Sequence, residues 1–244
     1  MAKPGAAVVA EFIGTFALTF FGAGAIIMTS PEALMGLGIK GAAPGGLVTV
    51  ALAHGLILTA FIAACGYISG GQFNPAVSLG LVVAGKQKPG TAFVYVIAQL
   101  AGAACAAGTL LLFLTSPVAN ADSVKIGATI GQLTTNGNFN AVVGIETILT
   151  AALVFVVLAS AVDKRANGFG AVAIGMTVAA CIMAAGPLTG ASMNPARSFG
   201  PALCGNRWEM FHAYIIGPCL GAIVAGLIYR VFWDSPAEKS APAS

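Results

Sequence analysis

The stretch SGGQFNPAVSLG, residues 69–80, holds the triplet Asn74-Pro75-Ala76 inside a chain that is almost uncharged. The same triplet returns as Asn194-Pro195-Ala196 within GASMNPARSFG, residues 190–200. Asn is a favoured N-cap, and Pro suits the first helical turn because its missing N–H has no intrahelical partner there. Each triplet therefore predicts the start of a helix.

The composition around the two triplets is that of an integral membrane protein. The chain has 244 residues, of which 58% are hydrophobic and 8% charged, whereas a soluble domain carries roughly 25% charged residues. Six apolar segments come close to the ~20 residues needed to span a bilayer. They are Ala6–Met28, Leu47–Tyr67, Thr91–Leu114, Ala141–Val162, Phe169–Ala185 and Phe211–Phe232.

The helices predicted after the triplets are too short to span. They run from Pro75 to about Ala84 and from Pro195 to about Cys204. Each measures about 15 Å at 1.5 Å per residue, which is half of a ~30 Å hydrocarbon core. A single such motif would fit an ordinary capped helix on the membrane surface equally well.

An internal repeat favours the half-helix interpretation. The first half begins its first span with AEFIGTFALTF from Ala10, and the second half begins with IETILTAALVF from Ile145. Each half has three spans and one half-helix, so the two halves must be inverted in the membrane. Inverted repeats with broken helices place a site near the bilayer midplane. The predicted fold is all-α, a single channel domain over residues 1–233 with repeats at about 6–114 and 141–233.

The charge distribution predicts the orientation. With six spans both termini lie on one side, and basic residues are enriched on the cytoplasmic side. Seven of the eleven Lys and Arg residues fall on the side of the termini, so we expect cytoplasmic termini and a disordered cytoplasmic tail at 234–244. These seven are Lys3, Lys86, Lys88, Lys164, Arg165, Arg230 and Lys239.

Two carboxylates, Glu11 and Glu146, fall at equivalent places in the first span of each half. An ionised carboxylate at mid-bilayer costs about 2.5–3.5 kcal/mol on insertion scales, so each needs hydrogen-bond partners. One hypothesis is a proton relay. The other is structural, with each carboxylate accepting N–H groups from the half-helix loop of its own repeat, and the equivalent placement favours it.

The half-helices predict the chemistry of the midplane site. Their N-termini meet there, each with about half a positive charge. Asn74 and Asn194 add amide donors, and the preceding loops can supply carbonyl acceptors where they line a water-filled cavity. Such a centre suits the oxygen of a neutral molecule and repels cations.

With both motifs in place, the chain resembles the aquaporin (major intrinsic protein) family over roughly residues 5–233. The resemblance implies a right-handed bundle of six helices with two half-helices. It also implies a homotetramer with a pore in each protomer, and passive bidirectional permeation of water.

The resemblance also identifies a second constriction, the selectivity filter, at His54, Ile182, Ala191 and Arg197. Arg197 directly follows the second triplet and is a permanent cation with a fork of donors. This set resembles the tonoplast intrinsic protein subfamily, which is associated with water and with ammonia, urea or hydrogen peroxide. We expect His54 to offer a donor or acceptor to the solute, although a lone His on an apolar span is commonly a packing residue.

A glycerol channel is the alternative within the family. Ser198 and Ala202 are water-type residues, and the glycerol branch usually has Asp in place of Ser198. Tyr214 is water-like, but Ile215 stands where the water branch normally has Trp. Gln72 replaces a His found in many members, so we predict no His-based gate.

Other classes of function fit the sequence less well. An ion channel or coupled transporter would need a carboxylate ring or carbonyl filter in the pore, and the sequence offers Arg197 and amide donors instead. A non-permeating scaffold of the same fold would not need the two Asn-Pro-Ala motifs. The five cysteines are unpatterned, and neither a metal site nor a cofactor is expected. We expect no enzyme activity and no nucleic-acid partner. The expected partners are water, small neutral solutes, the bilayer and three further copies, in the cell (inner) membrane.

Overall fold

A computed structural model of the chain describes residues 5–36, 45–114, 125–166 and 168–234. The predicted tail beyond Asp234 and the basic residues Lys3, Lys40 and Lys239 lie outside the described residues. Within the described part, six helices are long and apolar enough to span a membrane, which confirms the six predicted spans. They are α1 (Ala6–Met28), α3 (Gly46–Ser69), α5 (Pro89–Phe113), α8 with its π-helical end (Phe139–Val162), α9 (Gly170–Thr189) and α11 with its π-helical end (Ala213–Trp233).

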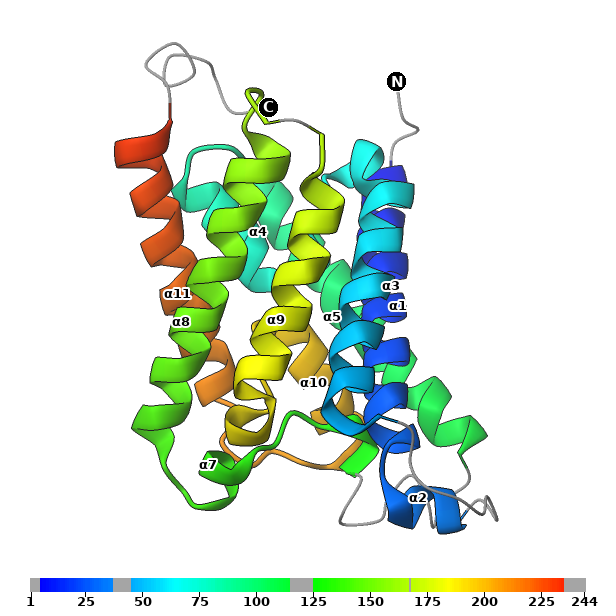
Figure 1. Cartoon of the computed structure of the whole chain (residues 1–244). Helices are drawn as coiled ribbons and strands as arrows, with labels where there is room; N and C mark the ends of the chain where they lie inside the picture. Colours follow the sequence, from blue (N-terminus) through cyan, green and yellow to red (C-terminus); the bar gives the residue numbers. More distant parts are fainter. Residues whose placement is uncertain (1–4, 37–44, 115–124, 167, 235–244) are drawn as a thin grey trace.

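The spans stand side by side, and α1 begins at the same end of the bundle at which α11 ends (Figure 1). We call this end the terminal face and the other the opposite face. The closest packing pairs α1 with α5, α3 with α9, and α8 with α11. Large apolar side chains such as Leu56, Phe93, Ile148 and Met176 are exposed on the outside of the bundle, as expected of a surface that faces lipid.

The two half-helices, α4 (Pro75–Val83) and α10 (Pro195–Gly205), fill opposite halves of the bundle. Their nine and eleven residues correspond to about 14 and 16 Å, close to the predicted lengths. Figure 1 shows α4 toward the terminal face and α10 toward the opposite face. The N-terminal ends therefore meet in the interior, as the inverted repeat requires.

Glycine allows the spans to pack closely within one protomer. A Cβ atom at Gly102 of α5 would collide with the backbone carbonyl of Phe12 in α1, and one at Gly175 of α9 with the carbonyl of Gly55 in α3. A Cβ at Gly221 of α11 would collide with the carbonyl of Thr147. These small residues therefore lie at crossings inside the bundle, as close helix approach in membranes requires.

Two short helices were not predicted in the connections on the opposite face. They are α2 (Pro31–Gly36) and α7 (Gln132–Thr135). Both segments lie in stretches rich in Pro, Gly or polar residues, which the sequence analysis treated as loops. Helices of six and four residues carry too little periodicity to be recognised in a sequence.

The crossing of α1 and α5 gives the first prediction. Gly102→Ala should lower the stability of the folded protein by about 1–3 kcal/mol because the added methyl group forces the two backbones apart. Gly144→Ala is the matched control, since a Cβ there would meet open space. Thermal unfolding in detergent should show a lower Tm for Gly102→Ala alone, and equal Tm values for the two variants would contradict the proposed crossing.

Candidate functional site

The two triplets meet at the centre of the bundle through reciprocal hydrogen bonds. Asn74 Nδ2 donates to the carbonyl of Met193 at 2.8 Å, and Asn194 Nδ2 donates to the carbonyl of Phe73 at 2.9 Å. Each Asn also caps its own half-helix: Oδ1 accepts from the backbone N–H of Ala76 in the first repeat, and from Ala196 and Arg197 in the second. Each amide nitrogen has one further hydrogen, for which the described residues show no acceptor.

The loop before α4 is held by the carboxylate of Glu11. Glu11 Oε1 accepts from Ser69 Oγ at 2.6 Å and from the Gln72 N–H at 3.0 Å. Glu11 Oε2 accepts from the Phe73 N–H at 2.7 Å and from Gln99 Nε2 at 2.8 Å. These four donors account for the fully buried carboxylate, which a bilayer interior tolerates only when partnered.

The second repeat copies this arrangement. Glu146 Oε1 accepts from Thr189 Oγ1 at 2.8 Å and from the Ser192 N–H at 3.0 Å. Glu146 Oε2 accepts from the Met193 N–H at 2.8 Å. All three donors belong to the segment that leads into α10, so each carboxylate holds the loop of its own repeat.

The residue before each Asn has a left-handed backbone. Phe73 has φ of 50° and Met193 has φ of 54°. This conformation is uncommon for residues other than glycine and stores strain that the surroundings must offset. At both positions the N–H binds the buried carboxylate and the C=O binds the opposite Asn, so the strained residue connects the two repeats.

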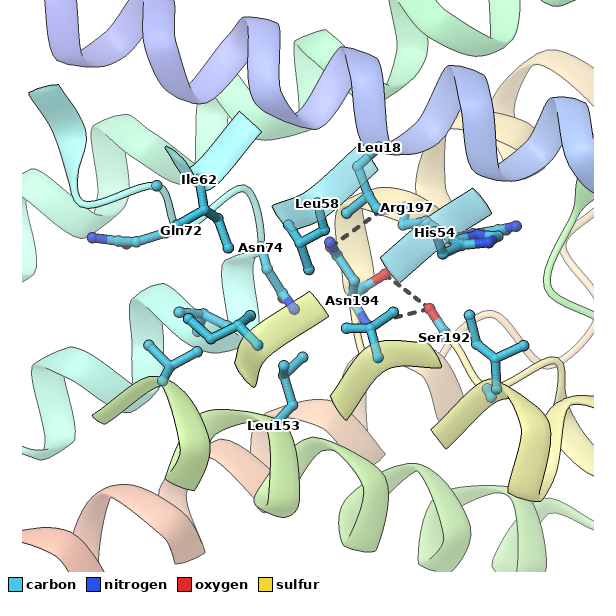
Figure 2. A pocket seen from close by; sticks show the side chains of 17 residues that line it. Leu18, His54, Leu58, Ile62, Gln72, Asn74, Leu153, Ser192, Asn194 and Arg197 are labelled. Atoms are coloured by element: carbon cyan, nitrogen blue, oxygen red, sulfur yellow. Dashed lines mark hydrogen bonds between the residues drawn. The ribbon is translucent and has the colours of Figure 1, made fainter. Parts of the chain in front are cut away.

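A narrow cavity passes through this centre (Figure 2). The space open to the centres of water molecules is about 30 Å³. Most of the wall is apolar, and its polar groups are few. The lining residues include Leu18, His54, Leu58, Gln72, Asn74, Leu153, Ile182, Ala191, Ser192, Asn194 and Arg197.

On the terminal side the cavity widens into a vestibule of about 390 Å³. Three residues, Ile62, Gln72 and Val157, line both spaces. The vestibule wall continues through Tyr67 and the segment between α8 and α9. The narrow cavity therefore leads toward the terminal face past Gln72.

Arg197 lies at the other end of the cavity and is almost completely buried. Its Nη1 donates to the carbonyl of Gly127 at 2.8 Å and to Thr129 Oγ1 at 3.3 Å, and its Nε donates to His54 Nε2 at 3.3 Å. Among the described residues Nη2 has no hydrogen-bond partner. Two N–H groups therefore remain for a solute.

The environment of His54 differs from the sequence expectation. Its Nδ1 lies 2.8 Å from the carbonyl of Val50, which can only accept, so Nδ1 carries the proton. Its Nε2 accepts from Arg197. Both ring nitrogens thus have protein partners, and the imidazole helps to hold the guanidinium of Arg197 in place. Gly22 leaves room for the ring, because a Cβ there would collide with it.

The two remaining filter positions are small or apolar. Ile182 in α9 and Ala191 in the loop before α10 both line the cavity and are buried. Neither side chain carries a polar atom. The structure therefore brings His54, Ile182, Ala191 and Arg197 to one narrow space.

Sequence reasoning missed the contribution of residues 127–129. Gly127 has φ of 65° and packs against Ala23 so closely that a Cβ would not fit. The carbonyl of Gly127 and the hydroxyl of Thr129 hold Arg197 from 70 and 68 positions away in the chain. In the sequence, only Gly127 indicates that the backbone packs closely against another segment. No feature of the sequence identifies Arg197 as its partner.

Residues 2–229 match the sequence profile of the family described as Major intrinsic protein. The chain belongs to the major intrinsic protein family. Aquaporin TIP4-4 from Zea mays is 41% identical over 225 residues, which cover 91% of this chain and 84% of the maize protein. Aquaporin AqpM from Methanothermobacter thermautotrophicus is 41% identical over 240 residues, covering 91% of this chain and 95% of AqpM.

A solved structure shares the fold. The aquaglyceroporin from Plasmodium falciparum superposes with a TM-score of 0.80, covering 97% of this chain and 99% of its own, at 24% identity. The likeness extends over all the spans and confirms the predicted aquaporin-like architecture. This major intrinsic protein is accordingly a multi-pass membrane channel and not an enzyme.

Glu11 supports a second prediction. Glu11→Gln replaces an acceptor oxygen with an NH2 group that faces N–H and O–H donors, which should destabilise the folded channel by about 1–3 kcal/mol. Thermal unfolding and the yield of monodisperse protein measure this loss. The exposed Glu209→Gln is the control. A normal Tm combined with altered proton permeability would instead support the proton-relay hypothesis.

A third prediction concerns pH at the terminal face. Arg165 donates to Asp163 through Nε at 2.8 Å and Nη2 at 2.5 Å, and it holds the pKa of this carboxyl well below its ordinary 3.8. A carboxyl group whose pKa is lowered in the folded state contributes its full stabilisation above its unfolded-state pKa. This contribution is lost as the pH falls from that value through the folded-state pKa. Asp163→Asn should therefore lower Tm at pH 7, and the difference from wild type should shrink below about pH 4. A difference independent of pH would contradict the ion pair.

Proposed function

We propose that this channel conducts water passively in both directions, passes ammonia, urea and hydrogen peroxide as well, and excludes protons and ions. The observation that carries the proposal is the narrow cavity lined from Arg197 past the paired Asn amides to Gln72, a residue that also lines the vestibule. The similarity to aquaporins from Zea mays and Methanothermobacter thermautotrophicus supports water as a substrate.

The size of the cavity supports a single-file column. One water molecule needs about 10–15 Å³ of space for its centre, and the narrow section offers about 30 Å³. Molecules in such a section cannot pass one another. Its apolar wall binds them weakly, and the few polar groups replace hydrogen bonds lost on leaving bulk water.

Electrostatics supports exclusion of ions. Two half-helix N-termini meet at the Asn pair and contribute about half a positive charge each. Arg197 adds a full positive charge at the end of the narrow section that lies away from Gln72. Among the described residues, none that lines the narrow cavity has a carboxylate to offset these charges. A cation would lose its hydration and meet positive potential twice, whereas the oxygen of a neutral molecule finds donors.

The filter composition supports passage of solutes larger than water. Ile182 and Ala191 place no polar group in the wall, and the guanidinium of Arg197 is drawn toward His54 and the 127–129 segment. The aperture is thus bounded by one cation, the imidazole that it contacts and two apolar side chains. Urea and ammonia can accept hydrogen bonds from Arg197 Nη2.

The assembly and its orientation are part of the proposal. We assign the channel to a homotetramer in the cell membrane with the terminal face cytoplasmic. The excess of Lys and Arg on that side supports the orientation. The resemblance to the family supports the tetramer.

The test is stopped-flow light scattering on proteoliposomes after hyperosmotic steps of an impermeant sugar, urea and, in a third trace, glycerol. We expect shrinkage faster than in empty liposomes in all traces, followed by re-swelling in urea. Re-swelling in glycerol as fast as in urea would favour the glycerol-channel alternative. Shrinkage no faster than in empty liposomes would contradict the proposed water channel.

The filter gives a fourth prediction. Ile182→His adds a polar wall opposite Arg197 and should lower urea permeability by about tenfold, a typical effect of one pocket contact. Water permeability should fall much less. Ile182→Val keeps the wall apolar and is the matched control. Equal loss of water and urea flux in Ile182→His would contradict a selectivity role for this position.

A further inference from the structure

A chain of hydrogen bonds leads from Glu11 to the mouth of the narrow cavity. Gln99 Nε2 bonds both Glu11 Oε2, at 2.8 Å, and Ser78 Oγ, at 3.1 Å. Ser78 Oγ lies 2.6 Å from Gln72 Oε1, and Gln72 Nε2 bonds Gln87 Oε1. All five side chains are at least nine-tenths buried.

The carboxylate sets the direction of the first two bonds in this chain, and the bond from Ser78 Oγ to Gln72 Oε1 continues it. A carboxylate only accepts, so the Gln99 atom that faces Glu11 is its nitrogen. The same nitrogen faces Ser78, whose oxygen must accept and whose single hydrogen is then given onward. Its nearest acceptor is Gln72 Oε1 at 2.6 Å, since the alternative, the Asn74 carbonyl, lies at 3.2 Å.

This order fixes the amide of Gln72. With its oxygen occupied by Ser78, its nitrogen faces away and donates one hydrogen to Gln87 Oε1. The second hydrogen on Nε2 has no acceptor among the described residues. Gln72 lines both the narrow cavity and the vestibule. In Figure 2 it lies beyond Asn74, on the side away from Arg197 and His54.

We propose that Gln72 is a further solute-binding residue of the pore and that Gln87 is the residue that positions it. The ligand is the lone pair of a small neutral acceptor: water, urea, ammonia or peroxide. The amide is a fixed donor, because its oxygen is never presented to the solute. It is also uncharged and does not titrate, so donation at this point is independent of pH. This inference rests on the proposed channel function.

Gln87 has the properties required of a positioning residue. It lies in the short loop between α4 and α5, and Gln72 lies in the loop that leads into α4, so their bond ties the two ends of the half-helix region together. Its own Nε2 is buried and has no partner in the described part of the chain. Among the described residues, the side chain of Gln87 therefore makes its hydrogen bond through Oε1, to Gln72.

The test compares osmotic water permeability per folded channel in four proteoliposome preparations. Gln87→Met removes the acceptor at similar volume, Gln72→Met removes the donor, and the double variant removes both. We expect Gln72→Met to lower permeability by about fivefold, the effect of one hydrogen bond to the solute. Gln87→Met should lower it by a similar factor or less. The double variant should match Gln72→Met, because Gln87 acts only through Gln72.

A matched control is Gln132→Met, which makes the same exchange at an exposed Gln bonded to Asn136. It should leave permeability at the wild-type level. Gln87→Glu keeps an acceptor oxygen and should recover most of what Gln87→Met loses. Wild-type permeability in Gln87→Met, or losses that multiply in the double variant, would overturn the assignment of Gln87.

A second variant keeps the proposal testable if the Met variants fail to fold. Gln72→His places a group that titrates between pH 5 and 8 at the same point. If position 72 binds solute, water permeability becomes pH-dependent in this variant and stays flat in wild type. A flat profile in Gln72→His would overturn the solute-binding role. If wild type itself conducts no more water than empty liposomes, the proposed function fails, and this inference with it.

Discussion

The structure depends on how two stretches of non-helical backbone are hydrogen-bonded at the centre of a membrane protein. Unpaired N–H and C=O groups at that depth cost several kcal/mol each. Glu11 and Glu146 accept N–H groups from the loops before the two half-helices, and the Asn of each repeat donates to a carbonyl of the other. The carboxylates hold each loop within its own repeat, and the Asn pair joins the repeats.

The same bonds that stabilise the centre also determine which polar groups face the cavity. Because Asn74 and Asn194 each use one amide hydrogen on the opposite loop, the other hydrogen of each amide has no hydrogen-bond partner among the described residues and both side chains line the cavity. The two carboxylates bind the loops through N–H and O–H donors that stabilise their charge, and neither is among the described residues that line the cavity. In the proposed function, a solute meets donors and positive potential, with an apolar wall between them.

Much of this could be predicted from the sequence because its signals are local. The two half-helices begin at Asn-Pro-Ala as predicted, and they end at Val83 and Gly205, each within one residue of the predicted end. The spans follow from runs of apolar residues, and the equivalent positions of Glu11 and Glu146 indicated their partners. In each case the residues that form the feature lie close together or recur at a fixed place in the repeat.

The sequence did not indicate contacts between distant segments. The hydrogen bonds from Arg197 to Gly127 and Thr129 join residues about 70 positions apart. No sequence motif at either end predicts the other partner. The tautomer of His54 likewise depends on Val50 and Arg197 together. The sequence therefore did not predict that both ring nitrogens form hydrogen bonds within the protein. The bond from Gln72 to Gln87 forms because α4 runs back toward the terminal face. This direction brings the loop before α4 next to the loop after it.

The central claim is that water passes the paired Asn amides while charge does not. The most direct measurement follows shrinkage and internal pH together in proteoliposomes that contain a pH-sensitive dye, under a simultaneous osmotic and proton gradient. We predict water efflux well above that of empty liposomes, with a rate of pH change no greater than theirs. A pH change that accelerates in proportion to the protein content would contradict the account.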